Sequence, residues 1–90
     1  MLLLNDCFVF REIFKVHLLI PIRRNNISRD VLFLNETAAL IIDECSRADT
    51  AHDLALLISE KFVDVEKEDI MPELESYINE LISSGILLKR

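Results

Sequence analysis

The 90-residue sequence contains one glycine, two prolines, one tyrosine and no tryptophan. With a single glycine, the chain has no glycine-rich loop of the kind that binds phosphate groups. Its two cysteines form no CxxC pair, so we expect reduced thiols that pack as small apolar side chains. No apolar run approaches the roughly 18 residues of a membrane span, and the chain start lacks the features of a signal peptide. These absences predict a cytoplasmic protein with no membrane contact.

Side chains that could carry catalysis or hold a metal do not converge in the sequence. His17 and His52 lie far apart and lack HxxxH or HExxH spacing. Neither Cys7 nor Cys45 lies in the electropositive setting that lowers a thiol pKa. The acidic residues of 64–75 lack the glycine turn and ligand order of a calcium loop, and indicate a solvated helix face. We therefore predict no catalytic residue, no metal site and no cofactor.

The residues that are present describe one globular domain spanning 1–90. Hydrophobic residues make up 51% and charged residues 29%, and the net charge is −6. Residues 1–30 carry five bases and three acids (+2), whereas residues 31–90 carry five bases and thirteen acids (−8). A nucleic-acid-binding surface requires clustered positive charge. The acidic second part of the chain therefore argues against nucleic acid as a partner.

The first third of the chain has the composition of β-strands. Runs of β-branched, aromatic and aliphatic residues predict strands at 8–13, 16–20 and 31–34, the first two joined by a tight turn at Phe14-Lys15. Pro21 lacks a backbone N–H, so the second strand should end there or lie at an edge.

After Leu34 the apolar spacing changes to the helical period. We expect helices at 36–45, from Thr50 to about 62, and at 66–84, with Asn35 and Thr50 as N-caps. Gly85 stands where a helix C-cap needs it, before an extended tail. Pro72 should kink the third helix if that helix starts near Glu66, and should lie harmlessly in its first turn if it starts near Asp69.

The segment 31–42, which reads VLFLNETAALII, resembles the family of pyrroloquinoline-quinone synthesis protein D (PqqD). In that family a Leu-Asn-Glu-Thr segment leads from the third strand into the first helix. The resemblance extends over about 8–88. Two departures affect the turns: Phe14-Lys15 stands where the family often has glycine, and Arg29-Asp30 stands where it often has Asn-Gly.

The resemblance implies an α+β fold, in which a three-stranded antiparallel sheet is followed by three helices, similar to a winged helix-turn-helix. Domains of this family recognise the leader segment of a ribosomally made precursor peptide and present it to a modifying enzyme, often a radical SAM enzyme. The leader adds as a strand to the third strand, beside the third helix.

An edge strand suits such a role, because its unpaired N–H and C=O groups can bind an extended peptide. Apolar side chains of the third strand and of the third helix would line the groove, and two acidic side chains beside it would favour a basic residue in the leader. The expected peptide-binding residues are Asp30, Val31, Leu32, Phe33, Leu34, Glu73, Tyr77, Glu80 and Leu81.

Two other classes fit the same order of elements. A winged-helix DNA-binding regulator would place its third helix in the major groove, but residues 66–84 carry six acids and one base. A plain assembly module would dimerise through its exposed apolar edge. We accordingly expect a monomer or a weak homodimer.

Overall fold

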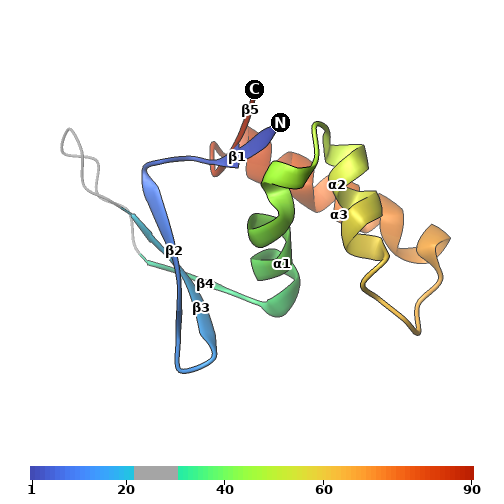
Figure 1. The fold of residues 1–90 in the computed structure, drawn as a ribbon, viewed down its shortest axis with the longest axis horizontal. Helices are drawn as coiled ribbons and strands as arrows, with labels where there is room; N and C mark the ends of the chain where they lie inside the picture. The colour runs from blue at the N-terminus through green and yellow to red at the C-terminus, as the bar shows by residue number, and fades with distance from the viewer. Residues whose placement is uncertain (22–30) are drawn as a thin grey trace.

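The structure, a computed structural model, describes residues 1–21 and 31–90 of the chain. Three strands precede three helices, and two further short strands lie near the two chain ends (Figure 1). The elements are β1 (Leu2–Leu4), β2 (Phe8–Ile13), β3 (Val16–Pro21), β4 (Leu32–Leu34), α1 (Glu36–Glu44), the 3-10 turn η1 (Cys45–Arg47), α2 (Ala51–Ser59), α3 (Lys67–Ser83) and β5 (Leu87–Lys89).

The strands β2, β3 and β4 form an antiparallel sheet in that order. This confirms the predicted α+β fold with a three-stranded sheet followed by three helices. Figure 1 shows α1 between this sheet and the pair α2 and α3. The helix α1 therefore has to bury side chains on two sides.

Side chains alternate between the two faces of the sheet. Cross-strand partners share a face, so the register Leu18↔Phe33 places these two residues together, and Leu19↔Leu32 places the next pair on the opposite face. The second face packs on α1, where Phe8 and Leu19 are buried with Ile42. Phe33 therefore belongs to the face directed away from α1.

The helix termini follow the sequence predictions. The Asn35 side chain accepts a hydrogen bond from the backbone N–H of Ala38 at 2.8 Å, and the Thr50 hydroxyl accepts one from the N–H of Asp53 at 3.1 Å. At the end of α3, Gly85 adopts a φ of 82°. The N–H of the next residue, Ile86, donates back to the carbonyl of Leu81, as expected for a glycine that ends a helix. The predicted roles of Asn35, Thr50 and Gly85 are confirmed.

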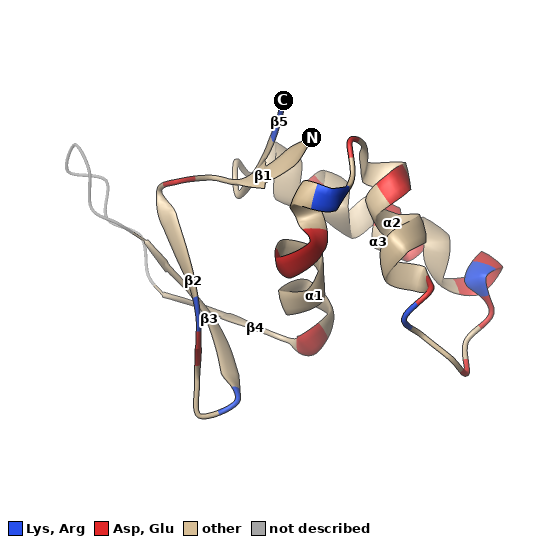
Figure 2. Ribbon diagram, viewed as in Figure 1, with Lys and Arg blue, Asp and Glu red and all other residues tan. Residues whose placement is uncertain are grey.

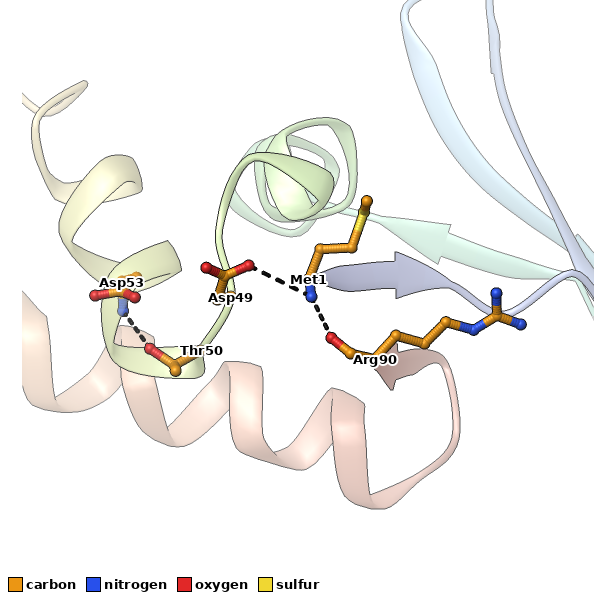
Figure 3. A network of polar contacts seen from close by, with 5 residues as sticks. All are labelled: Met1, Asp49, Thr50, Asp53 and Arg90. Carbon is orange, nitrogen blue, oxygen red and sulfur yellow. Dashed lines mark hydrogen bonds and ion pairs between the residues drawn. The ribbon is translucent and has the colours of Figure 1, made fainter.

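The strand β1, which was not predicted from the sequence, pairs antiparallel with β5 from the other end of the chain. Leu2 and Leu87 are fully buried in this pairing and pack against the helices. The Leu2 N–H also donates to the Ala48 carbonyl at 3.0 Å. Near this pairing the Met1 amino group lies 3.4 Å from the Asp49 carboxylate and donates to the Arg90 carbonyl (Figure 3).

Some boundaries differ from prediction. The helix α2 ends at Ser59 rather than near residue 62, although Phe62 still packs against the helical core. Two positions in the third helix were left open for Pro72, within the first turn or beyond it. The helix α3 starts at Lys67, so Pro72 lies inside the helix, past its first turn. Because proline has no N–H, the Glu68 carbonyl lacks its usual intrahelical donor.

The hairpin between β2 and β3 closes through two residues, since Ile13 pairs with Val16. Both turn residues have positive φ, 51° for Phe14 and 65° for Lys15. This is the conformation of a type I′ turn, which favours Asn-Gly. The Phe14 side chain is 95% exposed, so packing does not offset the unfavourable backbone conformation. The hairpin therefore forms without glycine in its turn, but the backbone of the turn is strained.

We expect the double substitution Phe14→Asn and Lys15→Gly to raise the free energy of unfolding by about 1 kcal/mol, because left-handed backbone costs side-chain-bearing residues roughly 1–2 kcal/mol each. Urea denaturation of the two proteins measures the difference. Lys15→Ala is the matched control: it removes the charge but keeps the Cβ, and should give no gain. Equal stability of the Asn-Gly protein and the parent would contradict the strained turn.

Candidate functional site

The strand β4 lies at one edge of the three-stranded sheet. Its one neighbour among the described residues is β3. Backbone groups on the other side of an edge strand can pair with an added extended segment. The edge of β4 is therefore one of the two edges of this sheet, with β2 as the other, where strand addition is geometrically available.

The side chains along this edge are largely apolar and open to solvent. Val31, Leu32 and Phe33 are exposed, and the Phe33 side chain is 77% exposed. Leu34 is half-buried and packs against the sheet cluster that contains Ile42 of α1. Leu34 thus holds the strand on the core, and Leu32 and Phe33 remain available on opposite faces. Of the predicted binding residues, Asp30 lies outside the described residues.

The predicted residues of α3 are placed differently from one another. Leu81 is buried in the helical cluster, in which Leu2 and Leu87 are also buried, so its side chain offers no surface to a ligand. Tyr77 is half-buried against the same cluster, whereas Glu73 and Glu80 are exposed. The structure therefore divides the predicted set between the sheet cluster and the helical cluster. One continuous groove made by all of them stays a prediction.

Burial affects the acid–base behaviour of two side chains. Desolvation raises the pKa of the Tyr77 phenol above its ordinary value of 10.0, and the negative charge of Glu80 raises it further. Desolvation also raises the pKa of the Cys45 thiol, although backbone hydrogen bonds partly oppose this. A raised thiol pKa disfavours the thiolate, which is the nucleophilic form. Cys45 therefore serves as a core residue.

A groove that was not predicted from the sequence lies between the β2–β3 hairpin and α1. Its volume is about 430 Å³. The lining residues are Phe10, Glu12, His17, Glu36, Ala39, Leu40 and Asp43. Two signals were available: strand alternation places Phe10 and Glu12 on one face, and helical spacing places Glu36, Leu40 and Asp43 on one side of a helix. Neither signal shows that the two faces meet.

The PqqD family model, described as coenzyme PQQ synthesis protein D, matches residues 18–87. The chain belongs to the PqqD family. Membership supports a role in natural-product biosynthesis of the kind that makes coenzyme PQQ. The match covers β4 and all three helices of the PqqD-like chain, and β1 and β2 lie outside it. Searches of the curated proteins and of the solved structures gave no significant match.

Two further properties of this PqqD family member bear on its partners. Within the part of the chain that the structure describes, no helix has both the length and the apolar character to cross a bilayer. Within the same residues, no three histidine, cysteine or acidic side chains are grouped closely enough to hold a metal ion.

The raised pKa of Tyr77 predicts an alkaline loss of stability. The neutral phenol contributes stability that is complete below pH 10.0 and is lost as the pH rises through the higher pKa of the folded state. Tyr77→Phe removes the titrating group and keeps the ring, so its stability should fall less steeply above pH 10.0. Urea midpoints of both proteins over this alkaline range test the expectation. Parallel pH profiles would show that Tyr77 does not titrate with a raised pKa.

Proposed function

We propose that the protein is a non-catalytic peptide-binding module. It takes the leader segment of a ribosomally made precursor peptide as an added strand on β4 and presents that peptide to a modifying enzyme, with a radical SAM enzyme as the expected type. The observation that carries the proposal is the open edge of β4, bearing exposed Leu32 and Phe33, in a member of the PqqD family.

The energetics require both backbone and side-chain contacts. A hydrogen bond contributes about 1 kcal/mol net, and β4 has three residues, so ladder bonds alone fall short of the roughly −8 kcal/mol of micromolar affinity. Fully burying one large apolar side chain contributes about 1.5–3 kcal/mol. Leu32 is 38% exposed and Phe33 is 77% exposed, so covering these two side chains supplies part of the remainder. Burial of the leader's own apolar side chains has to supply the rest.

Both histidines and one of the two cysteines are already engaged or sequestered, and the other cysteine, Cys7, is half-buried. His17 lies 3.7 Å from Glu12, and His52 lies 3.3 Å from Glu75, each in a surface pair. The Cys45 thiol is buried, with a raised pKa. These placements support presentation of the peptide to a separate enzyme, with the modification reaction taking place on that enzyme.

The distribution of charge favours a peptide over DNA. Figure 2 shows acidic positions along α3 and in the connection that precedes it. The first turn of α3 contains Glu68 and Asp69, and Glu73 and Glu80 farther along are exposed. DNA phosphates would be repelled by such a helix in the major groove, whereas a leader with a basic residue would be attracted to it. That charge affects mainly the association rate, because rim charges contribute little affinity.

Amide-shift mapping by NMR tests the proposed edge. The ligand is a short precursor peptide, to be sought among the genes that neighbour the gene for this chain. We expect the largest shifts at residues 31–34, with side-chain shifts at Tyr77 and little change in α2, because the added strand pairs directly with the β4 backbone. Duplex DNA is the control ligand and should produce no specific shifts. Shifts centred on α2, with β4 unchanged, would contradict strand addition.

A matched pair of substitutions separates backbone from side-chain contacts at Val31, the residue immediately before β4. Val31→Pro removes one N–H and restricts φ, whereas Val31→Ala shortens the side chain and keeps the N–H. We expect proline to weaken precursor binding about fivefold more than alanine, which corresponds to one net hydrogen bond. Isothermal titration measures both affinities, and urea denaturation checks that both variants are folded. Equal losses in the two variants would show that this N–H takes no part.

A further inference from the structure

The groove between the β2–β3 hairpin and α1 is on the sheet face that packs against the helix. It is an open hollow of about 430 Å³ and its exposed lining is mostly apolar. Ala39 is buried and Leu40 is half-buried at its wall. Phe10 and His17 line it from neighbouring strands, with ring centroids 6.0 Å apart and ring planes inclined by 14°. The groove thus combines aliphatic walls with an aromatic pair.

Three carboxylates border this groove: Glu12 from β2, and Glu36 and Asp43 from α1. All three residues are exposed, and the described lining contains no lysine or arginine. Figure 2 shows acidic positions towards both ends of α1, beside the hairpin. The groove therefore presents negative charge around an apolar interior.

The α1 carboxylates in the groove differ from their neighbour outside it. Glu44 is paired with Arg47 at 3.1 Å and with Lys61 at 3.7 Å. Within residues 1–21 and 31–90, no ion pair involves Glu36 or Asp43. His17 adds an Nδ1 atom that is shielded from solvent and has no hydrogen-bond partner among the described residues. Glu12 and His17 lie 3.7 Å apart, so the groups left without a partner among the described residues are the Glu36 and Asp43 carboxylates and the Nδ1 atom of His17.

The spacing of these carboxylates distinguishes between kinds of cation. The described residues bring no three acidic, histidine or cysteine side chains close enough to share a metal ion. A larger organic cation can reach both carboxylates of the α1 wall, Glu36 and Asp43. Arginine fits better than lysine, because its planar guanidinium stacks on aromatic rings and carries five donors. Its methylene stem would lie along the aliphatic wall.

We propose that this groove binds an arginine side chain of a polypeptide partner. The guanidinium lies against the Phe10–His17 pair and donates to Glu36 and Asp43. The site lies over β2 and β3 on the sheet face that packs against α1, whereas the proposed leader adds along the outer edge of β4. It is therefore a second contact surface, and its existence does not depend on strand addition to β4.

The test titrates the isotope-labelled full chain with N-acetyl-arginine methylamide and follows backbone amides by NMR. The matched ligand is the citrulline analogue, which replaces the charged guanidinium by a neutral urea of similar shape. We expect saturable shifts at Phe10–Glu12, at His17 and in α1, with residues 31–33 unchanged. Citrulline should bind about tenfold more weakly or worse, because charge-assisted hydrogen bonds are lost.

Matched variants test the carboxylates. The double variant Glu36→Gln and Asp43→Asn should lose about tenfold in arginine affinity. The control double variant Asp64→Asn and Glu66→Gln removes the same charge from the α2–α3 connection and should bind as the parent does. Equal losses in both variants would reduce the effect to net charge and overturn the proposal. If the α1 variant fails to fold, the comparison of arginine with citrulline on the parent chain decides.

Three other outcomes would overturn the proposal. Equal affinity for citrulline would show that charge is not recognised. Equal affinity for N-acetyl-lysine methylamide would show a general cation surface without the predicted stacking. Displacement of the arginine analogue by millimolar magnesium would indicate a metal site. The experiment leaves the proposal for β4 untouched, because the precursor peptide is absent and the two surfaces report on different amides.

Discussion

The arrangement of the molecule depends on α1 burying side chains on two sides. Ile41 is fully buried in the cluster formed by the helices with β1 and β5, whereas its neighbour Ile42 is buried in the sheet cluster with Phe8 and Leu19. Consecutive residues on an α-helix point about 100° apart, so a single helix can contribute to both clusters. This double burial joins the sheet to the helices, and Ile86 also contacts both clusters.

Both candidate surfaces follow from that position of α1. The helix covers one face of the sheet and leaves the edge of β4 open, and Asn35 begins the helix immediately after that strand. The same helix directs Glu36, Leu40 and Asp43 towards the hairpin and so forms one wall of the second groove. One surface is the outer edge of β4, and the other lies over β2 and β3 on the side of the same sheet that faces α1. A module built this way could contact two polypeptides at once.

The β2–β3 turn shows that a fold can persist after its preferred residues are replaced. Phe14 and Lys15 occupy backbone conformations that glycine or asparagine would adopt at lower cost. The paired strands on either side of the turn, with Leu19 buried between sheet and helix, outweigh the local strain. Phe14 itself gains no packing in return, since its side chain is almost wholly exposed.

The sequence by itself determined the elements whose signals are local. Strand alternation, the caps at Asn35 and Thr50, and the single glycine at position 85 each depend on residues a few positions apart, so they could be recognised without the fold. The segment 31–42 also identified the family.

Tertiary structure decided the features that depend on partners distant in the sequence. The leucines of β1 form a strand because residues 87–89 are there to pair with them. Leu81 and Tyr77 share one helix, yet the first is buried in the cluster that also contains Leu2 and Leu87, and the second stays half-exposed. Helical periodicity indicates only which residues share a face of the helix. The neighbouring elements determine how much of that face is covered.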